Sequence, residues 1–502
     1  MWDVHDQKRC REVAFLERTM VQEKMSGRSA VVVADVDGTI LATDLLYESL
    51  LLALKRNPLV FFLLPWWLLR GRATLKSELA RRAEGLRVDL MPVHEGVVSY
   101  LETQAASGRR VILASASDER LVARVADRFN FVSHSIGSSV SRNCKGSKKA
   151  ESIKEHLGQN DWEYVGDSEA DIAVWREACE VTAVVSSAGQ AETILSAFPG
   201  ARMIEVVRPS WSVILRVLRV HQWLKNFLIF APMFLAHRWL EPMVVGRSVL
   251  AAVAFSLCAS GVYIVNDLLD LASDRQHPRK KKRPCAAGTF PLVYAICLAP
   301  LLFVSAFGVA WQIHSHFVGL LLVYLLITTA YSFRLKAIVL VDIILLAMLY
   351  TIRIVGGGVA TEIPLSQWLL GVSMFLFLSL ACVKRFSELL ILQQRNEKRT
   401  WGRGYWVGDM EQVSSFGSAS GYIAALVLVL YVSSNEVVAL YQSPKMIWLA
   451  CPLMLYWISR VWLLARRGLV HDDPLVFALR DVGTYAVGLL GLLIFTAARL
   501  GL

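Results

Sequence analysis

The stretch Ala30-Val-Val-Val-Ala-Asp-Val-Asp-Gly-Thr39 decides the fold of the N-terminal part of the chain. Its run of small and β-branched apolar residues is typical of a strand buried on both faces of a parallel sheet. Asp35 and Asp37 end the run at positions i and i+2, so their side chains point to the same side. Their mutual repulsion favours a bound cation such as Mg²⁺. One carboxylate can attack phosphorus while the other transfers the proton of the leaving group.

Further apolar runs follow, separated by helical patterns, at VILASAS (111–117), EYVGDS (163–168) and VTAVVSS (181–187). Alternation of strands and helices predicts an α/β domain with a parallel sheet. In such a sheet, active sites lie at the carboxyl ends of the strands. Polar residues end these runs, so we expect them to meet at one edge of the sheet.

Polar blocks at the strand ends supply the groups that phosphate chemistry requires. Gly38 lets the backbone approach a phosphate, and Ser115 can donate a hydrogen bond to a phosphoryl oxygen. The block 143–149 (NCKGSKK) supplies cations for the charge that develops in phosphoryl transfer. The block 166–171 (GDSEAD) supplies carboxylates for Mg²⁺.

The four polar blocks lie in the order 35–39, Ser115, 143–149 and 166–171. Together they resemble the haloacid dehalogenase superfamily of aspartate-nucleophile phosphatases over residues 29–200. The resemblance implies a Rossmann-like domain with a small cap and one Mg²⁺. It implies that Asp35 is the nucleophile, Asp37 the general acid and base, and Ser115 a phosphate ligand. It assigns Asp35, Asp37, Asp167 and Asp171 to the metal site and Gly38, Thr39 and Lys145 to substrate binding. Lys149 is our choice for the motif lysine, because the family often shows KGxxK, and Lys145 is its competitor.

Residues 44–98 are expected to form the cap over this site. They include the apolar run 58–69 (PLVFFLLPWWLL), which is too short to cross a bilayer. Lys55, Arg56, Arg70 and Arg72 flank the run. This pattern is typical of a segment in the membrane interface, where apolar side chains reach the acyl chains and cations bind anionic lipid. The alternative is that the run packs against the domain core.

The composition separates the two parts of the chain. Its 502 residues are 55% hydrophobic, with 53 Lys and Arg against 42 Asp and Glu, and the mean hydropathy is +0.45. These values exclude a disordered, collagen-like or disulfide-scaffold protein and disfavour a purely soluble one. The first 208 residues carry 27 basic and 28 acidic residues, and the remainder carries 26 and 14. The net charge of +11 therefore belongs to the C-terminal part, where acidic residues are scarce.

About nine apolar stretches in the C-terminal part are long enough, or nearly so, to cross a bilayer. They lie at 213–236, 244–265, 290–311, 316–333, 338–356, 367–383, 417–434, 443–464 and 480–498. The loops beginning at Asn266, Phe333, Lys384 and Ala465 carry most of the loop Lys and Arg. This asymmetry predicts an integral cytoplasmic-membrane protein with residues 1–208 and both catalytic sites on the cytoplasmic side and the C-terminus outside.

A cluster of acids closes the second apolar stretch. Asp267, Asp270 and Asp274 lie at i, i+3 and i+7, and Asn266 lies four residues before Asp270. On a helix all four fall near one face, spaced to hold Mg²⁺ bridging a diphosphate. Ionised carboxylates near a bilayer are costly, so they indicate function.

This cluster, with the apolar stretches, resembles the UbiA superfamily of intramembrane prenyltransferases over residues 209–502. The resemblance implies a membrane domain of about nine transmembrane helices. Two further fragments fit this family, 223–226 (WLKN) and 331–336 (YSFRLK). They indicate that Lys225, Asn226, Tyr331 and Lys336 bind substrate.

The chain departs from this family at Asp342. Members that prenylate aromatic rings usually carry a second aspartate pair, DxxxD, after the fourth segment, whereas Ile338 and Leu346 stand four residues to either side of Asp342. We interpret Asp342 as completing the metal site or orienting a ribose.

Fragments at 350–368, 384–389 and 471–481 resemble a narrower branch, the decaprenyl-phosphate phosphoribosyltransferases. These enzymes move 5-phosphoribose from phosphoribosyl pyrophosphate to a polyprenyl phosphate. The diphosphate is then the leaving group of the sugar donor, and the sugar and lipid phosphates need cations. The candidates are Lys336, Arg353, Lys384 and Arg385, with Glu388 from the same fragment.

Three parts are therefore predicted: an N-terminal extension (1–28), a phosphatase domain (29–207) and a transmembrane transferase domain (208–502). The phosphatase would remove the 5-phosphate from the transferase product, which predicts a Mg²⁺-dependent bifunctional enzyme. Its partners would be polyprenyl phosphate, phosphoribosyl pyrophosphate and membrane lipid, without nucleic acid, with a homo-oligomer left open. Two alternatives remain: a transferase that uses a prenyl diphosphate with an aromatic or lipid acceptor, and a soluble domain that only anchors or regulates the transferase.

Overall fold

The structure is a computed structural model of the whole chain, and it describes residues 29–139, 142, 144–206, 210–398, 403–433, 441–470, 474–478 and 480–501. The predicted extension, Asn143 of the lysine block and residues 471–473 lie outside these ranges. The chain divides into two compact units. Unit 1 comprises the residues up to Val217 together with Ile264–Cys297, and unit 2 comprises Leu218–Tyr263 together with Leu298–Leu502.

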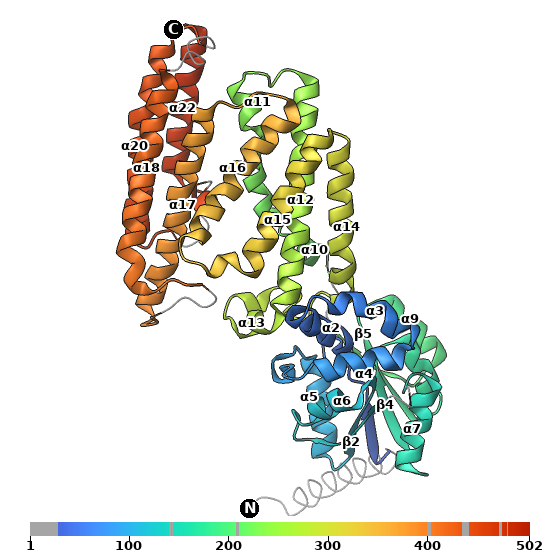
Figure 1. Cartoon of the computed structure of the whole chain (residues 1–502). Helices are drawn as coiled ribbons and strands as arrows, with labels where there is room; N and C mark the ends of the chain where they lie inside the picture. The colour runs from blue at the N-terminus through green and yellow to red at the C-terminus, as the bar shows by residue number, and fades with distance from the viewer. Residues whose placement is uncertain are drawn as a thin grey trace, which may run out of the picture. The chain divides into compact units, whose positions relative to one another are not determined.

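Unit 1 is built on a six-stranded parallel sheet of order β3-β2-β1-β4-β5-β6 (Figure 1). The strands are β1 (Val31–Ala34), β2 (Arg110–Asp118), β3 (Val132–Ser138), β4 (Trp162–Gly166), β5 (Glu180–Val185) and β6 (Arg202–Glu205). The four predicted runs correspond to β1, β2, β4 and β5. The edge strands β3 and β6 were not predicted, because both are partly exposed and lack a continuous apolar run.

Strand β1 occupies the centre of this sheet. Val31 pairs with Arg110 of β2 on one side and with Trp162 of β4 on the other. All four β1 residues are buried, since their side chains alternate between two apolar layers. One layer includes residues of α5 and α6, and the other includes residues of α7, α8 and α9. Residues that follow β1 are therefore delivered to the middle of the carboxyl edge of the sheet.

Helices cover both faces of the sheet, and the segment predicted as the cap folds as three helices and a short 3₁₀ turn between β1 and α5. The cap elements are α2 (Leu45–Arg56), α3 (Val60–Leu69), α4 (Arg72–Arg82) and η1 (Val88–Leu90). The others in unit 1 are α5 (Glu95–Ala106), α6 (Glu119–Ala126), α7 (Ser147–Leu157), η2 (Glu169–Asp171), α8 (Ile172–Trp175), α9 (Ala188–Ala197), α13 (Leu271–Gln276) and η4 (Lys280–Lys282). Asp44 caps α2, where its carboxylate accepts a hydrogen bond of 2.8 Å from the Leu46 N–H.

Unit 2 is helical, and α10 (Trp211–Leu218) leads into it (Figure 1). Its elements are η3 (Val220–Phe230), α11 (Ala231–Leu235), α12 (Pro242–Leu269), α14 (Leu292–Trp311), α15 (Ser315–Phe333), η5 (Leu335–Ala337), α16 (Val341–Thr361), α17 (Gln367–Gln394), η6 (Val407–Asp409), α18 (Met410–Val432), η7 (Pro444–Leu449), α20 (Ala450–Arg466), α21 (Pro474–Ala478) and α22 (Val482–Leu500). The ends of α12 and α14 lie in the segment assigned to unit 1.

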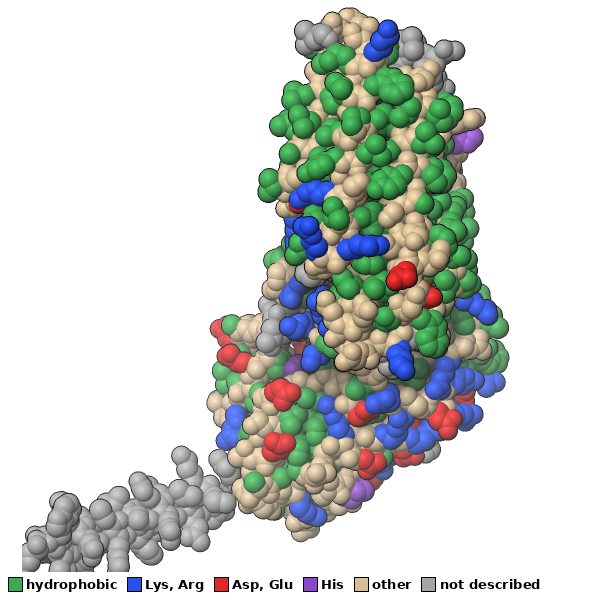
Figure 2. All heavy atoms as spheres, turned by 90° about the vertical axis from the view of Figure 1, so that its left-hand side faces the viewer, with side chains coloured by type: hydrophobic (Ala, Val, Ile, Leu, Met, Phe, Trp, Pro, Cys, Tyr) green, Lys and Arg blue, Asp and Glu red, His purple; other side chains and the backbone are tan. Residues whose placement is uncertain are grey.

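Within the described residues, eight helices are long and apolar enough to cross a membrane, and they match the last eight predicted stretches. On the face shown in Figure 2, hydrophobic side chains cover most of the helical unit, while charged side chains are more frequent over unit 1. The stretch predicted at 213–236 is not one helix. Arg219 adopts a left-handed conformation (φ 52°) that ends α10, and the chain continues as η3 and α11.

A close helix contact at Gly357 of α16 provides a test of this packing. An ideal Cβ at Gly357 would lie 1.9 Å from the carbonyl oxygen of Ile229. Because a backbone atom cannot swing aside, we expect Gly357→Ala to destabilise unit 2 by about 1–3 kcal/mol. The measurement is the midpoint of thermal unfolding of the full chain in detergent, which should fall.

Gly308→Ala in α14 is the matched control. Nothing lies within 4 Å of a Cβ at Gly308, so the midpoint should stay the same or rise. An unchanged midpoint for Gly357→Ala would contradict the close approach of η3 to α16.

Candidate functional site

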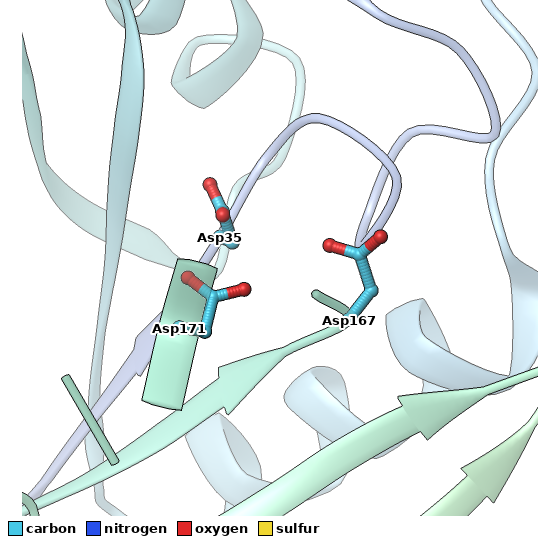
Figure 3. A group of neighbouring side chains, drawn as sticks. All are labelled: Asp35, Asp167 and Asp171. Atoms are coloured by element: carbon cyan, nitrogen blue, oxygen red, sulfur yellow. The ribbon is translucent and has the colours of Figure 1, made fainter. Parts of the chain in front are cut away.

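Three carboxylates from two strand ends converge at the carboxyl edge of the unit 1 sheet (Figure 3). Asp35 follows β1, Asp167 follows β4, and Asp171 ends η2. Each offers an oxygen, and these oxygens all lie within 4.8 Å of one another. Asp35 and Asp171 are buried, so their charges are poorly solvated. This geometry suits a divalent cation bound by oxygen ligands.

The pKa values of these acids support a cation site. Burial, together with the charges of Asp171 and Asp167, raises the pKa of Asp35 well above its usual value despite the neighbouring Lys149. Burial and the charge of Asp171 raise the pKa of Asp167 to about 6. A bound cation would relieve both the desolvation and the repulsion, so this set of donors fits Mg²⁺.

Lys149 of α7 is buried beside the three acids. Its Nζ lies 2.7 Å from Asp35 Oδ2 and 3.3 Å from Asp171 Oδ1 and donates a 2.8 Å hydrogen bond to the Tyr164 hydroxyl. Burial lowers the pKa of Lys149, but the charges of Asp35 and Asp171 together raise it above its usual value. Lys145 is exposed in the structure. Of the two lysines left open by the sequence, the structure therefore brings Lys149 to Asp35.

The carboxylate of Asp37 is held apart from this group by its own hydrogen bonds. Ser115 and Ser117 donate to Asp37 Oδ2 at 2.8 and 2.6 Å, and the Leu45 N–H donates to Oδ1 at 2.7 Å. Among the described residues, the three-acid group does not include Asp37. Its side chain is thus placed for proton transfer next to Ser115, while its assignment to the metal site is not reproduced by the side-chain geometry.

Gly38 and Thr39 bring the loop after β1 against Asp167. Gly38 has φ 78°, and a Cβ there would lie 2.5 Å from Asp167 Oδ2. The Thr39 hydroxyl donates a 3.0 Å hydrogen bond to Asp167 Oδ1. Only glycine fits this close approach, and Thr39 contacts an acid rather than standing free for a substrate.

A cavity of about 1140 Å³ opens over this site, with Asp35, Asp37, Ser115, Lys145 and Lys149 in its lining. The cavity also reaches cap residues of α2, α3 and α4. The site is therefore roomy enough for a substrate much larger than a phosphate group.

The acid cluster at 266–274 is not on one continuous helix, because α12 ends at Leu269 and α13 begins at Leu271. The backbone bond from Asp270 N to Asn266 O (3.0 Å) is nevertheless kept. Asp267 and Asp274 are buried and share Arg283, whose Nη1 lies 3.0 and 2.6 Å from their oxygens.

Asp270 points elsewhere, with Oδ1 at 3.2 Å from the Nζ of Lys55. The structure thus brings Asp267 and Asp274 together but not Asp270 with them. Asp274 Oδ1 is buried and has no hydrogen bond from any described residue, and the Lys280 Nζ lies 3.9 Å from it.

In unit 2, Asp342 of α16 forms a fully buried ion pair with Arg385 of α17 at 2.8 Å. The Tyr331 hydroxyl donates to Asp342 Oδ1 at 2.7 Å. Arg385 also pairs with Glu388, which pairs with Arg403. These predicted residues therefore form one charge network across α15, α16 and α17.

A second network in unit 2 joins η3, α15 and α16. Arg353 is buried and donates from Nε to Asn226 Oδ1 at 2.8 Å and from Nη2 to the Tyr324 hydroxyl at 3.0 Å. Lys225 lies over the Tyr350 ring, with Nζ 5.6 Å from the ring centroid. The remaining predicted cations, Lys336 and Lys384, are half-buried.

Comparison with known proteins matches residues 226–479 to the UbiA prenyltransferase family and residues 32–176 to the haloacid dehalogenase-like hydrolases. An uncharacterized protein, y4nM, of Sinorhizobium fredii is 32% identical over 92% of this chain and 90% of its own. The nodulation protein NoeC of Azorhizobium caulinodans is 33% identical over 55% of this chain and 89% of its own. The decaprenyl-phosphate phosphoribosyltransferase of Mycobacterium tuberculosis is 38% identical over 36% of this chain and 61% of its own.

The chain belongs to the UbiA prenyltransferase family. It carries a haloacid dehalogenase-like hydrolase domain ahead of the UbiA domain, and it is an integral membrane protein. The hydrolase match contains every site residue predicted in unit 1 from Asp35 to Asp171, and the UbiA match contains every later one except Lys225.

Several side chains that contact the predicted site residues are not predicted from the sequence. Ser117 and Tyr164 contact Asp37 and Lys149, and both lie in runs that had been assigned to strands. Arg283 of the UbiA domain contacts Asp267 and Asp274 and lies in a basic run that had been interpreted as a topology signal. Their closeness in sequence to the motif residues is a signal that the sequence offers. Closeness in sequence does not show, however, which side chains touch in the fold.

Competition between protons and Mg²⁺ provides a test of the three-acid site. Asp167, with its pKa at about 6, is protonated below that pH, so bound Mg²⁺ must displace a proton. We expect the apparent Mg²⁺ affinity to fall at least about tenfold for each pH unit below 6, because protons on Asp167 and on Asp35, whose pKa is also raised, compete with the cation. Isothermal titration calorimetry of the full chain in detergent measures this.

Asp171→Asn should remove this pH-dependent binding, whereas the control Asp89→Asn, at an exposed acid of η1, should retain it. Mg²⁺ binding that is independent of pH, or unchanged in Asp171→Asn, would rule out the three-acid site.

Proposed function

We propose that the chain is a bifunctional membrane enzyme. Its UbiA domain transfers 5-phosphoribose from phosphoribosyl pyrophosphate to a polyprenyl phosphate, and its hydrolase domain then removes the 5-phosphate to give polyprenyl-phosphoryl ribose. The observation that carries the second step is the buried Asp35 held between Lys149 and the acids Asp167 and Asp171. The first step is supported by the similarity to decaprenyl-phosphate phosphoribosyltransferases, which are 37–38% identical over 36–37% of this chain.

In the hydrolase step, Asp35 attacks the phosphorus of the 5-phosphate, and the bond between phosphorus and the ribose oxygen breaks. Asp37, held by Ser115 and Ser117, donates a proton to the leaving oxygen. Asp37 then takes a proton from water, which attacks the phosphorus of the phosphorylated Asp35 and releases inorganic phosphate. Mg²⁺ held by Asp35, Asp167 and Asp171 would neutralise phosphoryl oxygens. Lys149 offsets the charge of the buried acids throughout.

In the transferase step, an oxygen of the lipid phosphate attacks the anomeric carbon of the ribose, and the bond to the diphosphate breaks. We assign Asn266, Asp267, Asp270 and Asp274 to Mg²⁺, which would stabilise the leaving diphosphate. Arg283 contacts both Asp267 and Asp274, so it would hold these two carboxylates in position.

The cations of unit 2 divide between two roles in this proposal. We assign Lys225, Lys336 and Lys384 to the phosphates of the sugar and the lipid. Arg353 and Arg385 are buried and hydrogen-bonded or paired within the protein, so they are positioning residues for Asn226 and Asp342. The pairing of Asp342 with Arg385 favours a role in orienting the substrate over a role as a metal ligand.

The second candidate is a transferase that uses a prenyl diphosphate, which the match to the prenyltransferase family favours. Incubation with a geranyl-type diphosphate and an aromatic acid distinguishes the two. Against this candidate, Asp342 is paired with Arg385, which leaves it poorly suited to a second metal-binding aspartate pair.

We further propose that unit 1 and the loops rich in Lys and Arg lie on the cytoplasmic side, with the C-terminus outside. Cys179 is exposed in unit 1. A membrane-impermeant thiol reagent should therefore modify Cys179 only after the cells are opened.

The product of the full chain provides the main test. With Mg²⁺, polyprenyl phosphate and labelled phosphoribosyl pyrophosphate, the wild-type lipid product should lack the 5-phosphate. Asp35→Asn, which has no nucleophilic carboxylate, should still label the lipid but leave the 5-phosphate on it and release no phosphate. Chromatography of the labelled lipid measures this.

Asp89→Asn is the control and should behave as wild type. Phosphate release by Asp35→Asn would refute the assignment of the nucleophile, and absence of labelled lipid in the wild type would refute the transferase step.

Asp267→Asn tests the acid cluster separately. Loss of one carboxylate next to the diphosphate should slow lipid labelling by at least about 100-fold, since metal stabilisation of the leaving group contributes several kcal/mol. Hydrolysis of a soluble aryl phosphate at the Asp35 site should be unchanged. Glu411→Gln, at an exposed acid of α18, is the control for labelling. Normal labelling by Asp267→Asn would remove this residue from the site.

A further inference from the structure

Helix α3 of the cap exposes an unusual number of large apolar side chains. Its outer face, defined here as Leu59, Phe62, Trp66 and Leu69, has exposed fractions of 65%, 74%, 54% and 84%. The four residues lie at helical spacing on a helix of ten residues, with Leu59 as its N-cap. A contiguous apolar patch of this kind on a soluble surface marks an interaction site.

The opposite side of α3 is firmly packed in the cap. Val60 and Trp67 are buried in an apolar cluster with Ala53 of α2 and Leu79 of α4. The guanidinium of Arg82 lies 4.5 Å from the Trp67 ring centroid. The outer face therefore belongs to a helix that is packed firmly in the cap, so its apolar side chains are exposed although the helix is well anchored.

A third side of α3 lines the cavity that holds Asp35. Leu64, Pro65 and Leu68 belong to this wall. Other apolar cap residues of the wall are Leu46 and Leu50 of α2 and Leu75 and Leu79 of α4. Apolar surface thus extends from the outer face of α3 into the cavity of the nucleophile.

Cations stand on both sides of this helix. Lys55 and Arg56 precede it, and Arg70 and Arg72 follow it. Arg70 stacks on Trp66 at 4.7 Å from the ring centroid, and Arg72 lines the cavity. Apolar side chains flanked by exposed cations are complementary to the acyl boundary and the anionic headgroups of a bilayer.

We propose that α3 lies in the headgroup boundary of the bilayer and forms the entrance through which the hydrolase site receives a phosphomonoester carried on a long apolar chain. This inference rests on the proposed function only in taking Asp35 as the nucleophile of a phosphatase. It adds the route by which the substrate reaches Asp35, and it extends the substrate class from the ribose lipid to lipid phosphomonoesters in general.

The walls of the cavity give the chemical reason. A water-soluble sugar phosphate offers no group to bury against the leucines of α2, α3 and α4. A lipid chain would pack against these leucines and remove them from water. Because these contacts lie away from the reacting phosphate, their binding energy can position the phosphate at Asp35. Because the chain has membrane-spanning helices, a lipid substrate in the same bilayer would meet the cap at a high local concentration.

The test uses the full chain reconstituted in vesicles of phosphatidylcholine and phosphatidylglycerol. The substrates are polyprenyl-phosphoryl 5-phosphoribose and phosphatidic acid, both lipid phosphomonoesters, and p-nitrophenyl phosphate as the soluble one. In the triple variant Phe62→Ser, Trp66→Ser and Leu69→Ser, kcat/KM for lipid substrates should fall at least about tenfold while p-nitrophenyl phosphate is hydrolysed within about twofold of wild type. Leu195→Ser, at an exposed leucine of α9, should change neither.

A second measurement does not depend on activity. With Cys10, Cys179 and Cys297 replaced by Ser, a fluorophore on Leu69→Cys should be quenched by brominated lipids in the vesicles, and one on Leu195→Cys should not. Quenching that is equal at both positions would overturn the location of α3 at the membrane.

The outcomes separate this inference from the proposed function. Lipid hydrolysis unchanged in the triple variant would overturn the inference and leave both proposed steps standing. Hydrolysis of p-nitrophenyl phosphate without either lipid would overturn the inference and the proposed second step, and leave the transferase step standing. Hydrolysis of phosphatidic acid without the ribose lipid would refute the proposed second step while supporting the inference. Failure to hydrolyse any of the three would refute both.

Discussion

The contact between the Lys149 ammonium and the carboxylates of Asp35 and Asp171 is the interaction on which the hydrolase unit depends. Buried charges are costly unless they are paired, and here three acids occupy one pocket. A single lysine from α7 offsets part of that charge and leaves the remainder for a divalent cation. The sheet order makes this possible, because β1 and β4 are neighbours and deliver Asp35 and Asp167 to the same edge.

The same rule governs the helical unit. Asp342 and Arg385 neutralise each other between two apolar helices, and Arg353 satisfies its donors on Asn226, Tyr324 and the Leu349 carbonyl. Removing one partner of such a pair would leave an uncompensated charge in a low dielectric. The charged residues inside unit 2 therefore define its helix packing as well as its chemistry. Gly357 of α16 complements them by allowing η3 to approach the helix backbone at Ile229.

The proposed order of reactions is chemically coherent, because removal of a phosphate by the hydrolase domain would make a reversible transfer by the UbiA domain effectively one-way. A lipid product does not diffuse away in water, so its next enzyme must work at the membrane surface. The cap helix α3 combines an exposed apolar face, a wall of the catalytic cavity and flanking cations in ten residues. This combination meets the need of an enzyme whose substrate is amphiphilic.

From the sequence by itself one could determine the central strands, the acids at their ends and the apolar spans, because these depend on local periodicity and composition. The edge strands β3 and β6 were missed since partial exposure leaves no apolar run. Only the tertiary structure decided between Lys149 and Lys145, which are four residues apart and of the same type. It alone paired Asp342 with Arg385 and placed Arg283 between Asp267 and Asp274. Such pairings join residues on different elements, and no local pattern encodes which charges will share a buried space.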